Sequence, residues 1–400
     1  MHTAQPMTNR HRLRTLAVSL STLLAACTWL PRPEVLAPRP SPVLELPVRP
    51  QSQRRTDNVI VVTIDGVRWQ DVFGGVDPAM ATMASIPARE VVDAATLLPN
   101  LYAFAREGVV SGAPGHGKPM MASGPNYVSL PGYLEIFSGS TSVGCRTNGC
   151  DPTTRRTFFD RARDEVAATD RDVAIISSWE KIAHAASSAP ERLTVSAGRH
   201  GGATRDRVRI DSELDAMLDA AAASAPTPGH DDYRADAHTS AIALRYLERA
   251  RPRVLAVGLG DTDEHAHAGD YASYLAALRG ADRFLGELRA TLARMGSYGA
   301  HTTVVVTCDH GRSSGFNDHG WDSPESGRVW MVAAGGAVPA LGYLDEGGAE
   351  RLADIAPTLE GLLGMASPNE GPRGNLMAAL ASAVSPRYVA RSGSSPTLYR

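Results

Sequence analysis

Three mainly apolar runs constrain the fold of this 400-residue chain more than any other feature. They span residues 58–64, 254–260 and 303–308 and are rich in valine, isoleucine and leucine. None of them alternates polar with apolar side chains, as a strand with one solvated face would. Each run therefore predicts a strand that is buried on both faces, which is typical of a parallel sheet.

Strand and helix segments alternate along the rest of the chain. Further strands are expected over residues 172–177 and 328–334. Apolar residues with helical spacing predict helices over residues 97–107, 130–137, 155–168, 211–223, 233–250, 271–295 and 350–363. This alternation predicts an α/β fold, with a mostly parallel central sheet and helices on both faces. Residues 180–229 are less regular, and we expect a small insertion or cap there.

The first residues have the pattern of an export signal. Three arginines are followed by the apolar stretch 15–26, which is too short to span a bilayer. The stretch ends in Leu24-Ala25-Ala26-Cys27, which resembles the lipobox of bacterial lipoproteins, where the cysteine carries the lipid. An ordinary secretory signal is the alternative. We expect an exported protein of the periplasm or cell envelope, anchored to the membrane through Cys27.

The composition divides the chain into four regions. Residues 1–27 are the expected signal peptide with its lipobox, and the Pro-rich residues 28–56 are the expected tether. Residues 57–370 are long enough for a large catalytic domain, and residues 371–400 form a C-terminal tail. The net charge of -3 carries no basic signature, so we expect no nucleic-acid partner.

The three cysteines beyond the signal differ in their surroundings. Cys145 and Cys150 are separated by a turn-like loop, and an oxidising compartment would allow a local disulfide between them. Cys308 is the last residue of the third apolar run, which predicts a small buried side chain.

Acidic residues and histidines follow the three apolar runs. They are Asp65 after the first run, Asp263 and His267 after the second, and Asp309, His310 and His319 after the third. The carboxyl ends of parallel strands meet at one edge of a sheet, so these side chains are expected to share one site. Asp263 and His267 are four residues apart and can reach one ion from the same face of a helical turn. Carboxylate and imidazole ligands together suit Zn²⁺, Mn²⁺ or iron.

Ser129 is the candidate nucleophile for such a site. It follows a loop rich in glycine and proline and precedes the helix expected over residues 130–137, whose N-terminus would favour a phosphate group. A serine hydroxyl needs a base or a metal to become nucleophilic. The same position also suits a helix N-cap, with Pro131 in the first turn, and the local sequence alone favours that interpretation.

The order of these motifs resembles the alkaline phosphatase superfamily. The motifs are Asp65-Gly66, Ser129-x-Pro131, Asp263-x-x-x-His267-x-Gly269, Asp309-His310-Gly311 and His319-Gly320-Trp321-Asp322. Within the superfamily, the chain is most similar to the type I phosphodiesterase/nucleotide pyrophosphatase branch, and the resemblance covers residues 58–364.

The resemblance implies a two-metal hydrolase of phosphoric esters, a phosphodiesterase or phosphatase, that acts on a small-molecule phosphate ester. The first of two divalent ions, Zn²⁺ or alternatively Mn²⁺, would be held by Asp263, His267 and His319. The second ion would be held by Asp65, Asp309 and His310, with Ser129 bound to it. Attack by the serine would form a phosphoseryl intermediate, which water would hydrolyse.

The chain departs from the branch beside the nucleophile. Gly132 and Tyr133 stand where the branch often has Asn and His, so Asn126 becomes the candidate for holding the phosphate. Tyr133 also stands where sulfatases carry an arginine, which argues against a sulfatase-like esterase. A phosphoryl or phospho-alcohol transferase or mutase is the alternative function. A surface lipoprotein without catalysis is a further one, which the complete ligand set argues against.

Overall fold

The computed structural model describes residues 55–202, 204–346 and 348–365. The predicted signal peptide with Cys27, nearly all of the predicted tether and the C-terminal tail lie outside these residues. An eight-stranded sheet has the strand order β10 (Gly342–Tyr343), β2 (Gly108–Ser111), β9 (Met331–Gly335), β7 (Thr302–Thr307), β1 (Asn58–Ile64), β6 (Val254–Leu259), β4 (Val173–Ser177), β5 (Thr194–Ala197). Only β9 pairs antiparallel with its neighbours, so the prediction of a mostly parallel sheet is confirmed.

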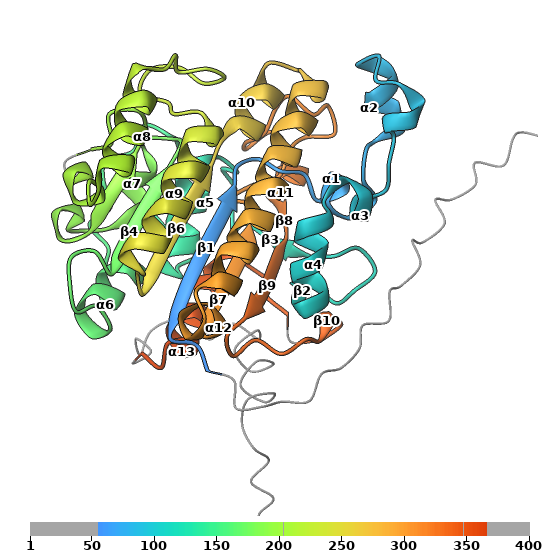
Figure 1. Ribbon diagram of the computed structural model, residues 1–400. Helices are drawn as coiled ribbons and strands as arrows, with labels where there is room; N and C mark the ends of the chain where they lie inside the picture. The colour runs from blue at the N-terminus through green and yellow to red at the C-terminus, as the bar shows by residue number, and fades with distance from the viewer. Residues whose placement is uncertain (1–54, 203, 347, 366–400) are drawn as a thin grey trace, which may run out of the picture. The chain divides into compact units, whose positions relative to one another are not determined.

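Helices cover both faces of the sheet (Figure 1). One face is covered by α4 (Pro99–Glu107), α9 (Asp236–Ala250) and α11 (Tyr271–Arg294), and the other by α5 (Ser129–Ser138), α7 (Ile182–Ala186) and α13 (Ile355–Leu362). The other α-helices are α1 (Trp69–Gly74), α2 (Pro78–Met83), α3 (Ala94–Leu97), α6 (Phe158–Glu165), α8 (Ser212–Ala223), α10 (Asp261–His267) and α12 (Ser297–Ala300). Short 3₁₀-helices span Ala88–Glu90, Pro190–Arg192, Arg205–Val208, Pro324–Gly327 and Leu352–Asp354.

The register of the central strands brings three strand ends to one edge. Ile64 lies opposite Leu259 of β6, and Thr63 lies opposite Thr307 of β7. All residues of β1 are buried, as are those of β6 and β7, because helices cover both faces. The residues that follow these three strands therefore emerge side by side, as the sequence predicted.

Asp236 and Asp261 cap each other's helices and so fix where α10 begins. Asp236 accepts hydrogen bonds from the backbone nitrogens of Gly260 at 2.8 Å and Asp261 at 3.1 Å. In return, Asp261 Oδ1 accepts a hydrogen bond of 3.1 Å from the backbone nitrogen of Asp236. These carboxylates satisfy amide groups that a helix start leaves without partners. Helix α10, which contains Asp263 and His267, is thereby tied to α9.

Two predictions about local structure were wrong in detail. The stretch 180–229, expected to be an insertion or cap, contributes β5 to the edge of the central sheet. The single strand expected over residues 328–334 is two strands: β8 (Arg328–Val329) pairs with β3 (Met120–Met121), and β9 joins the main sheet. Trp330, which lies between them, is completely buried. The sequence over residues 329–334 is therefore apolar throughout and does not mark the point where the chain passes from one sheet to the other.

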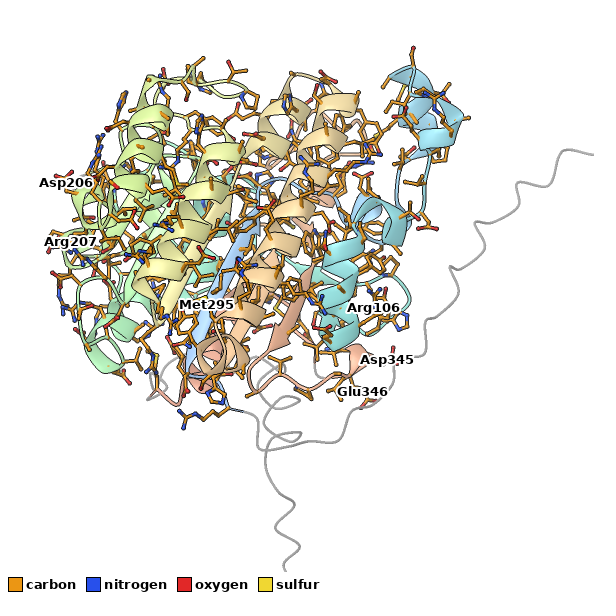
Figure 2. All side chains as sticks on the ribbon, in the orientation of Figure 1. Arg106, Asp206, Arg207, Met295, Asp345 and Glu346 are labelled. Atoms are coloured by element: carbon orange, nitrogen blue, oxygen red, sulfur yellow. A yellow bond between two sulfur atoms is a disulfide. The ribbon has the colours of Figure 1, made fainter. Side chains whose placement is uncertain are left out.

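The cysteines and charged residues complete the description. Cys145 and Cys150, whose pairing the sequence left open, form a disulfide. Cys308 is free and buried, as predicted. Figure 2 shows Asp206 and Arg207 on one flank of the domain and Asp345 and Glu346 on the opposite flank. Within the described residues, no helix combines the length and the apolar character that crossing a bilayer requires.

Candidate metal centre

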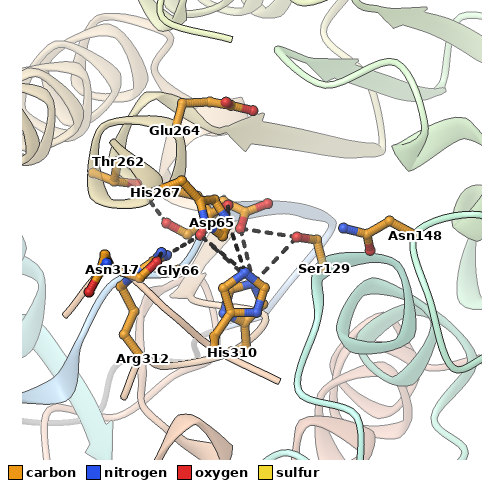
Figure 3. Close-up of polar contacts among 12 residues, drawn as sticks. Asp65, Gly66, Ser129, Asn148, Thr262, Glu264, His267, His310, Arg312 and Asn317 are labelled. Carbon is orange, nitrogen blue, oxygen red and sulfur yellow. Dashed lines mark hydrogen bonds and ion pairs between the residues drawn. The ribbon is translucent and has the colours of Figure 1, made fainter. Parts of the chain in front are cut away.

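Asp65, Asp309 and His310 form a group that could hold one metal ion. One ligand atom from each lies within 4.8 Å of the others. His310 Nε2 is 3.4 Å from Asp65 Oδ1 and 3.5 Å from Asp309 Oδ2 (Figure 3). The side chains of Asp309 and His310 are completely buried. These are the residues that the resemblance assigned to the second ion.

Asp263, His267 and His319 lie together next to this group. His267 Nε2 is 3.1 Å from Asp263 Oδ2 and 3.0 Å from His319 Nε2. His319 Nε2 is 3.8 Å from Asp263 Oδ1. His310 adjoins both groups, since its ring stacks on that of His319 with centroids 3.9 Å apart. The side chain of His267 is 46% exposed, so this group faces solvent on one side.

Two of the histidines are held in the tautomer that a metal ligand needs. His310 Nδ1 lies 2.8 Å from the carbonyl oxygen of Gly311, and His319 Nδ1 lies 2.7 Å from that of Tyr127. Because a carbonyl oxygen can only accept, each Nδ1 donates its proton, so in the neutral form of each ring Nε2 has the free lone pair. Such a hydrogen bond on the far nitrogen is typical of metal-binding histidines.

The electrostatics of the site favour a bound cation. Asp309 Oδ2 is buried and has no hydrogen-bond partner. Burial, and next the carboxylate of Asp65, raise the pKa of Asp309 well above its usual range. Burial opposes a charged His310, but the surrounding carboxylates, Asp309 first, outweigh it and raise the pKa of His310 to about 9. Both raised pKa values show that the buried carboxylates hold more negative charge than the site can stabilise without a cation. A divalent ion would neutralise this charge, so the residues fit a metal.

His319 has the opposite tendency. Burial, and next the charge of His310, lower the pKa of His319 to about 3. The imidazole is therefore neutral at physiological pH, which is the state that binds metals.

Ser129 lies beside the buried group, at the first residue of α5. Its Oγ is 3.4 Å from Asp65 Oδ1 and 3.3 Å from His310 Nε2 (Figure 3). The N-cap of α5 is Val128, and no side chain caps the helix there. The interpretation of Ser129 as an N-cap is therefore wrong, and its hydroxyl is turned toward the ligand group instead.

Two asparagines lie near Ser129, and they differ in their contacts. Asn126 Nδ2 donates a hydrogen bond of 2.8 Å to the carbonyl of Arg146, so its amide is already engaged. Asn148 Oδ1 accepts a hydrogen bond of 2.9 Å from the backbone nitrogen of Leu130. In Figure 3 the amide nitrogen of Asn148 is turned toward Ser129. Asn148 was missed in the sequence because nothing but its place between the two cysteines marks it.

A cavity of about 170 Å³ opens beside helix α5 and the loop that precedes it. Its lining includes Asn126, Pro131, Gly132, Arg146 and Asp309. The disulfide loop 145–150 contributes to one wall through Cys145 and Arg146. Ser129 itself does not line this cavity, which opens on the neighbouring face of α5 formed by Pro131, Gly132 and Glu135.

Two further residues that the sequence did not assign contact the ligand groups. Tyr133 donates a hydrogen bond of 3.1 Å from its hydroxyl to Asp65 Oδ2. Arg312 is paired with Asp263. Arg312 directly follows the Asp309-His310-Gly311 motif, so proximity was the only signal that could have found it.

Part of the chain matches a known family of enzymes. Residues 232–367 match the model of the Metalloenzyme superfamily. Among curated proteins, a 2,3-bisphosphoglycerate-independent phosphoglycerate mutase of Synechocystis sp. is 30% identical over 151 residues, which are 34% of this chain and 26% of the mutase. The corresponding mutase of Ruegeria sp. is 32% identical over 135 residues, 32% of this chain and 25% of the mutase. The chain thus spans about a quarter of the length of these relatives.

Solved structures share the fold over most of the chain. A 2-O GAG sulfatase superposes with a TM-score of 0.52 at 12% identity, over 81% of this chain and 75% of the sulfatase. A protein solved in complex with its substrate D-glucosamine-2-N,6-O-disulfate also has a TM-score of 0.52, at 13% identity, over 82% of this chain and 80% of that protein. At these identities the likeness concerns the fold alone. The match over residues 232–367 confirms the predicted superfamily for that part of the chain, whereas the branch within it stays a prediction.

Proposed function

We propose that this chain, whose residues 232–367 match the Metalloenzyme superfamily, is a phosphoryl-transfer enzyme in which Ser129 is the nucleophile. One observation carries this proposal: Ser129 Oγ lies 3.3 Å from His310 Nε2 and 3.4 Å from Asp65 Oδ1, within a group of metal ligands. In the described part of the chain, the contacts of the Ser129 hydroxyl are with members of this group, which supports a role in the chemistry. Its place at the start of a ten-residue helix also favours a bound phosphate.

Two divalent ions, Zn²⁺ or Mn²⁺, would activate an oxygen nucleophile and neutralise phosphate oxygens when bound by the two ligand groups. The residues of the chain supply the rest. Asp65 and His310 keep Ser129 Oγ in place, and Tyr133 holds the second oxygen of Asp65. Asn148 presents an amide nitrogen where it can donate to a phosphate oxygen, which supports a role in stabilising the charged transition state.

The proposed reaction has two balanced steps. Ser129 Oγ forms a bond to phosphorus while the bond from phosphorus to the ester oxygen breaks, and the alcohol leaves with a proton. An acceptor hydroxyl then takes the phosphoryl group and restores the serine. The acceptor is water in a phosphatase or phosphodiesterase and a second alcohol in a transferase or mutase.

The relatives favour transfer to an alcohol. Those with sequence similarity are phosphoglycerate mutases, which move a phosphate between hydroxyls, although the chain matches only about a quarter of their length. A phosphoryl transferase or mutase is therefore a candidate on the same footing as a hydrolase. Sulfatase activity has weaker support, because the sulfatase likeness concerns the fold and Tyr133 replaces the arginine of that motif.

A trapping experiment tests this function. The Zn²⁺- or Mn²⁺-loaded protein is mixed with chromogenic phosphomonoesters, phosphodiesters and sulfate esters, with and without glycerol as an acceptor, and is quenched in acid. Mass spectrometry is expected to find phosphate on Ser129, and phosphoglycerol among the products would indicate a transferase. Ser129→Ala should abolish turnover but retain its metal.

Ser138→Ala is the matched control, because Ser138 lies on the same helix and donates to the carbonyl of Leu134. Full turnover by Ser129→Ala would refute the nucleophile. A protein that binds neither ion would support a lipoprotein without catalysis.

We further propose that the enzyme works in the cell envelope, attached through Cys27. The support is the arginine-rich start, the short apolar stretch and the Leu24-Ala25-Ala26-Cys27 sequence. Cys27→Ser should release the protein from the membrane fraction, and unchanged membrane association would contradict the anchor.

A further inference from the structure

Arg312 places a fixed positive charge against one of the two ligand groups. Its Nη1 donates to Asp263 Oδ1, and its side chain is completely buried (Figure 3). Nothing in the proposed chemistry uses this residue. A buried arginine beside a carboxylate that is expected to bind a cation therefore needs its own explanation.

The guanidinium is held from three sides. Its Nε donates to the carbonyl of Phe316 at 2.5 Å, and its Nη2 donates to the carbonyl of Asn317 at 2.8 Å. Gly66 leaves space for the pair: a Cβ there would lie 2.7 Å from Arg312 Nη1 and 2.3 Å from Asp263 Oδ1. Because every nitrogen of the guanidinium has a partner, Arg312 cannot turn away when an ion approaches.

The formal charges of the two groups differ as a result. Asp263 contributes one negative charge, Arg312 cancels it, and His267 and His319 are neutral ligands, so the sum is zero. Asp65 and Asp309 contribute two negative charges, and in the described part of the chain their only ion-pair partner is His310. The exposed His267 opens the first group to water, whereas Asp309 and His310 are completely buried.

We propose that Arg312 makes the Asp263–His267–His319 group the weak and exchangeable metal site, while the Asp65–Asp309–His310 group binds its ion tightly. Like charges repel, and the repulsion between a fixed guanidinium and a dication is strong away from bulk water. Arg312 also holds Asp263 Oδ1, which leaves Oδ2 facing His267 at 3.1 Å. It is a positioning residue that sets the occupancy of one site. The inference rests on the proposed function only in requiring two ions.

Metal affinity measures this directly. The metal-free protein is titrated with Zn²⁺ against a chromophoric chelator, and bound zinc is counted by elemental analysis. Two classes of site are expected, with dissociation constants at least about tenfold apart. Arg312→Gln, which removes the charge, should tighten the weaker class by about tenfold or more and leave the tighter class unchanged. Arg312→Lys, which keeps the charge, should leave the weaker class weak.

Further variants keep the inference testable if Arg312→Gln does not fold. His267→Ala should remove the weaker class alone, and Asp309→Asn should remove the tighter one. Loss of the tighter class in His267→Ala would overturn the inference. So would equal affinities in the wild type, or a weaker class that Arg312→Gln leaves unchanged or weakens.

Because the zinc titration measures binding and not turnover, it tests this inference separately from the proposed function. A protein that binds two zinc ions in the expected order but forms no phosphoserine would refute the function and leave the role of Arg312 standing. A protein that turns over substrate through Ser129 but binds two ions equally tightly would support the function and refute the role of Arg312.

Discussion

The hydroxyl of Tyr133 donates a hydrogen bond of 3.1 Å to Oδ2 of Asp65, the carboxylate that lies beside Ser129. Both groups are buried, and Thr63 Oγ1 lies 3.5 Å from the same hydroxyl. Tyr133 stands where the phosphodiesterase branch often has a histidine. In this chain, its side chain binds the proposed metal ligand Asp65 and is not placed as a substrate contact. Ser129 and Tyr133, four positions apart, thus contact the two oxygens of one carboxylate.

Tyr133→Phe should weaken metal binding without unfolding the protein. Loss of a hydrogen bond to a ligand typically costs about 10- to 100-fold in metal affinity. Zinc titration of the purified variant measures this loss. Tyr246→Phe is a matched control, because Tyr246 is also buried and donates to the carbonyl of Arg171, away from the site. Equal zinc affinity in both variants would contradict the role of Tyr133.

Metal removal should destabilise the described domain. The buried carboxylates repel one another without a cation, and an ion that binds only the folded state stabilises it by about 4 kcal/mol at a thousandfold excess over its Kd. Thermal unfolding followed by circular dichroism with zinc and with a chelator checks this. Ser129→Ala should show the same difference as the wild type, and an identical Tm with and without zinc would count against a metal centre.

Asn148→Ala should impair turnover more than Asn126→Ala. The amide nitrogen of Asn148 is turned toward Ser129, whereas that of Asn126 is bonded to the carbonyl of Arg146. Loss of a donor to a developing oxyanion costs about 100-fold in kcat or more. Steady-state kinetics of the two variants decide between them. A larger loss in Asn126→Ala would return the phosphate-holding role to that residue.

The disulfide should affect activity through Asn148. The bond between Cys145 and Cys150 closes the loop that carries this residue, and chain entropy alone gives such a short loop a stabilisation of about 2 kcal/mol. A Cys145→Ser, Cys150→Ser variant should lose about 10- to 100-fold in kcat/KM, because small displacements of a positioning group are costly. Wild type treated with a reductant should match it. Full activity in both would show that the loop holds its shape unaided.

The ion pairs of Asp211 predict a dependence of stability on pH. The hydrogen bond from the Leu214 backbone, followed by Arg245 and Arg249, lowers the pKa of Asp211 in the folded state. The stabilisation is therefore present above the unfolded pKa of about 4 and is lost as the pH falls through the lower folded value. Asp211→Asn should be less stable than wild type at neutral pH, with a gap that closes in acid.

Urea unfolding at several pH values measures this gap. Glu346→Gln is the control, since Glu346 is exposed on the opposite flank and should show no difference at any pH. A gap that is constant from neutral to acid pH would exclude the ionised carboxylate as its source.

The central strands and their ends could be predicted because a single local property determines them. Residues 58–64 and 302–307 are rich in β-branched residues, and such a segment favours a strand covered on both faces; every residue of both is buried. The ligands follow those strands directly, so the fold places them together without further information. Short strands such as Gly108–Ser111 and Thr194–Ala197 were missed, because four residues carry no periodicity.

The remaining site residues depend on contacts between distant segments. Arg312 meets Asp263 across 49 positions, and Tyr133 meets Asp65 across 68. Neither residue belongs to a pattern that is visible locally. Asn148 reaches Leu130 only because the chain turns back between them. These contacts arise only when the chain folds, so no local sequence pattern predicts them.

The hydrogen bond from His319 Nδ1 to the carbonyl of Tyr127 joins segments 192 positions apart in the sequence. Tyr127 precedes Ser129 by two residues, so this hydrogen bond connects the loop that contains His319 to the segment just before α5. An ion bound through His319 would fix the imidazole ring, and the hydrogen bond would then also restrain the segment that leads to Ser129. Loss of that ion would free both the ring and the proposed nucleophile, so metal binding and alignment of the serine oxygen would be coupled.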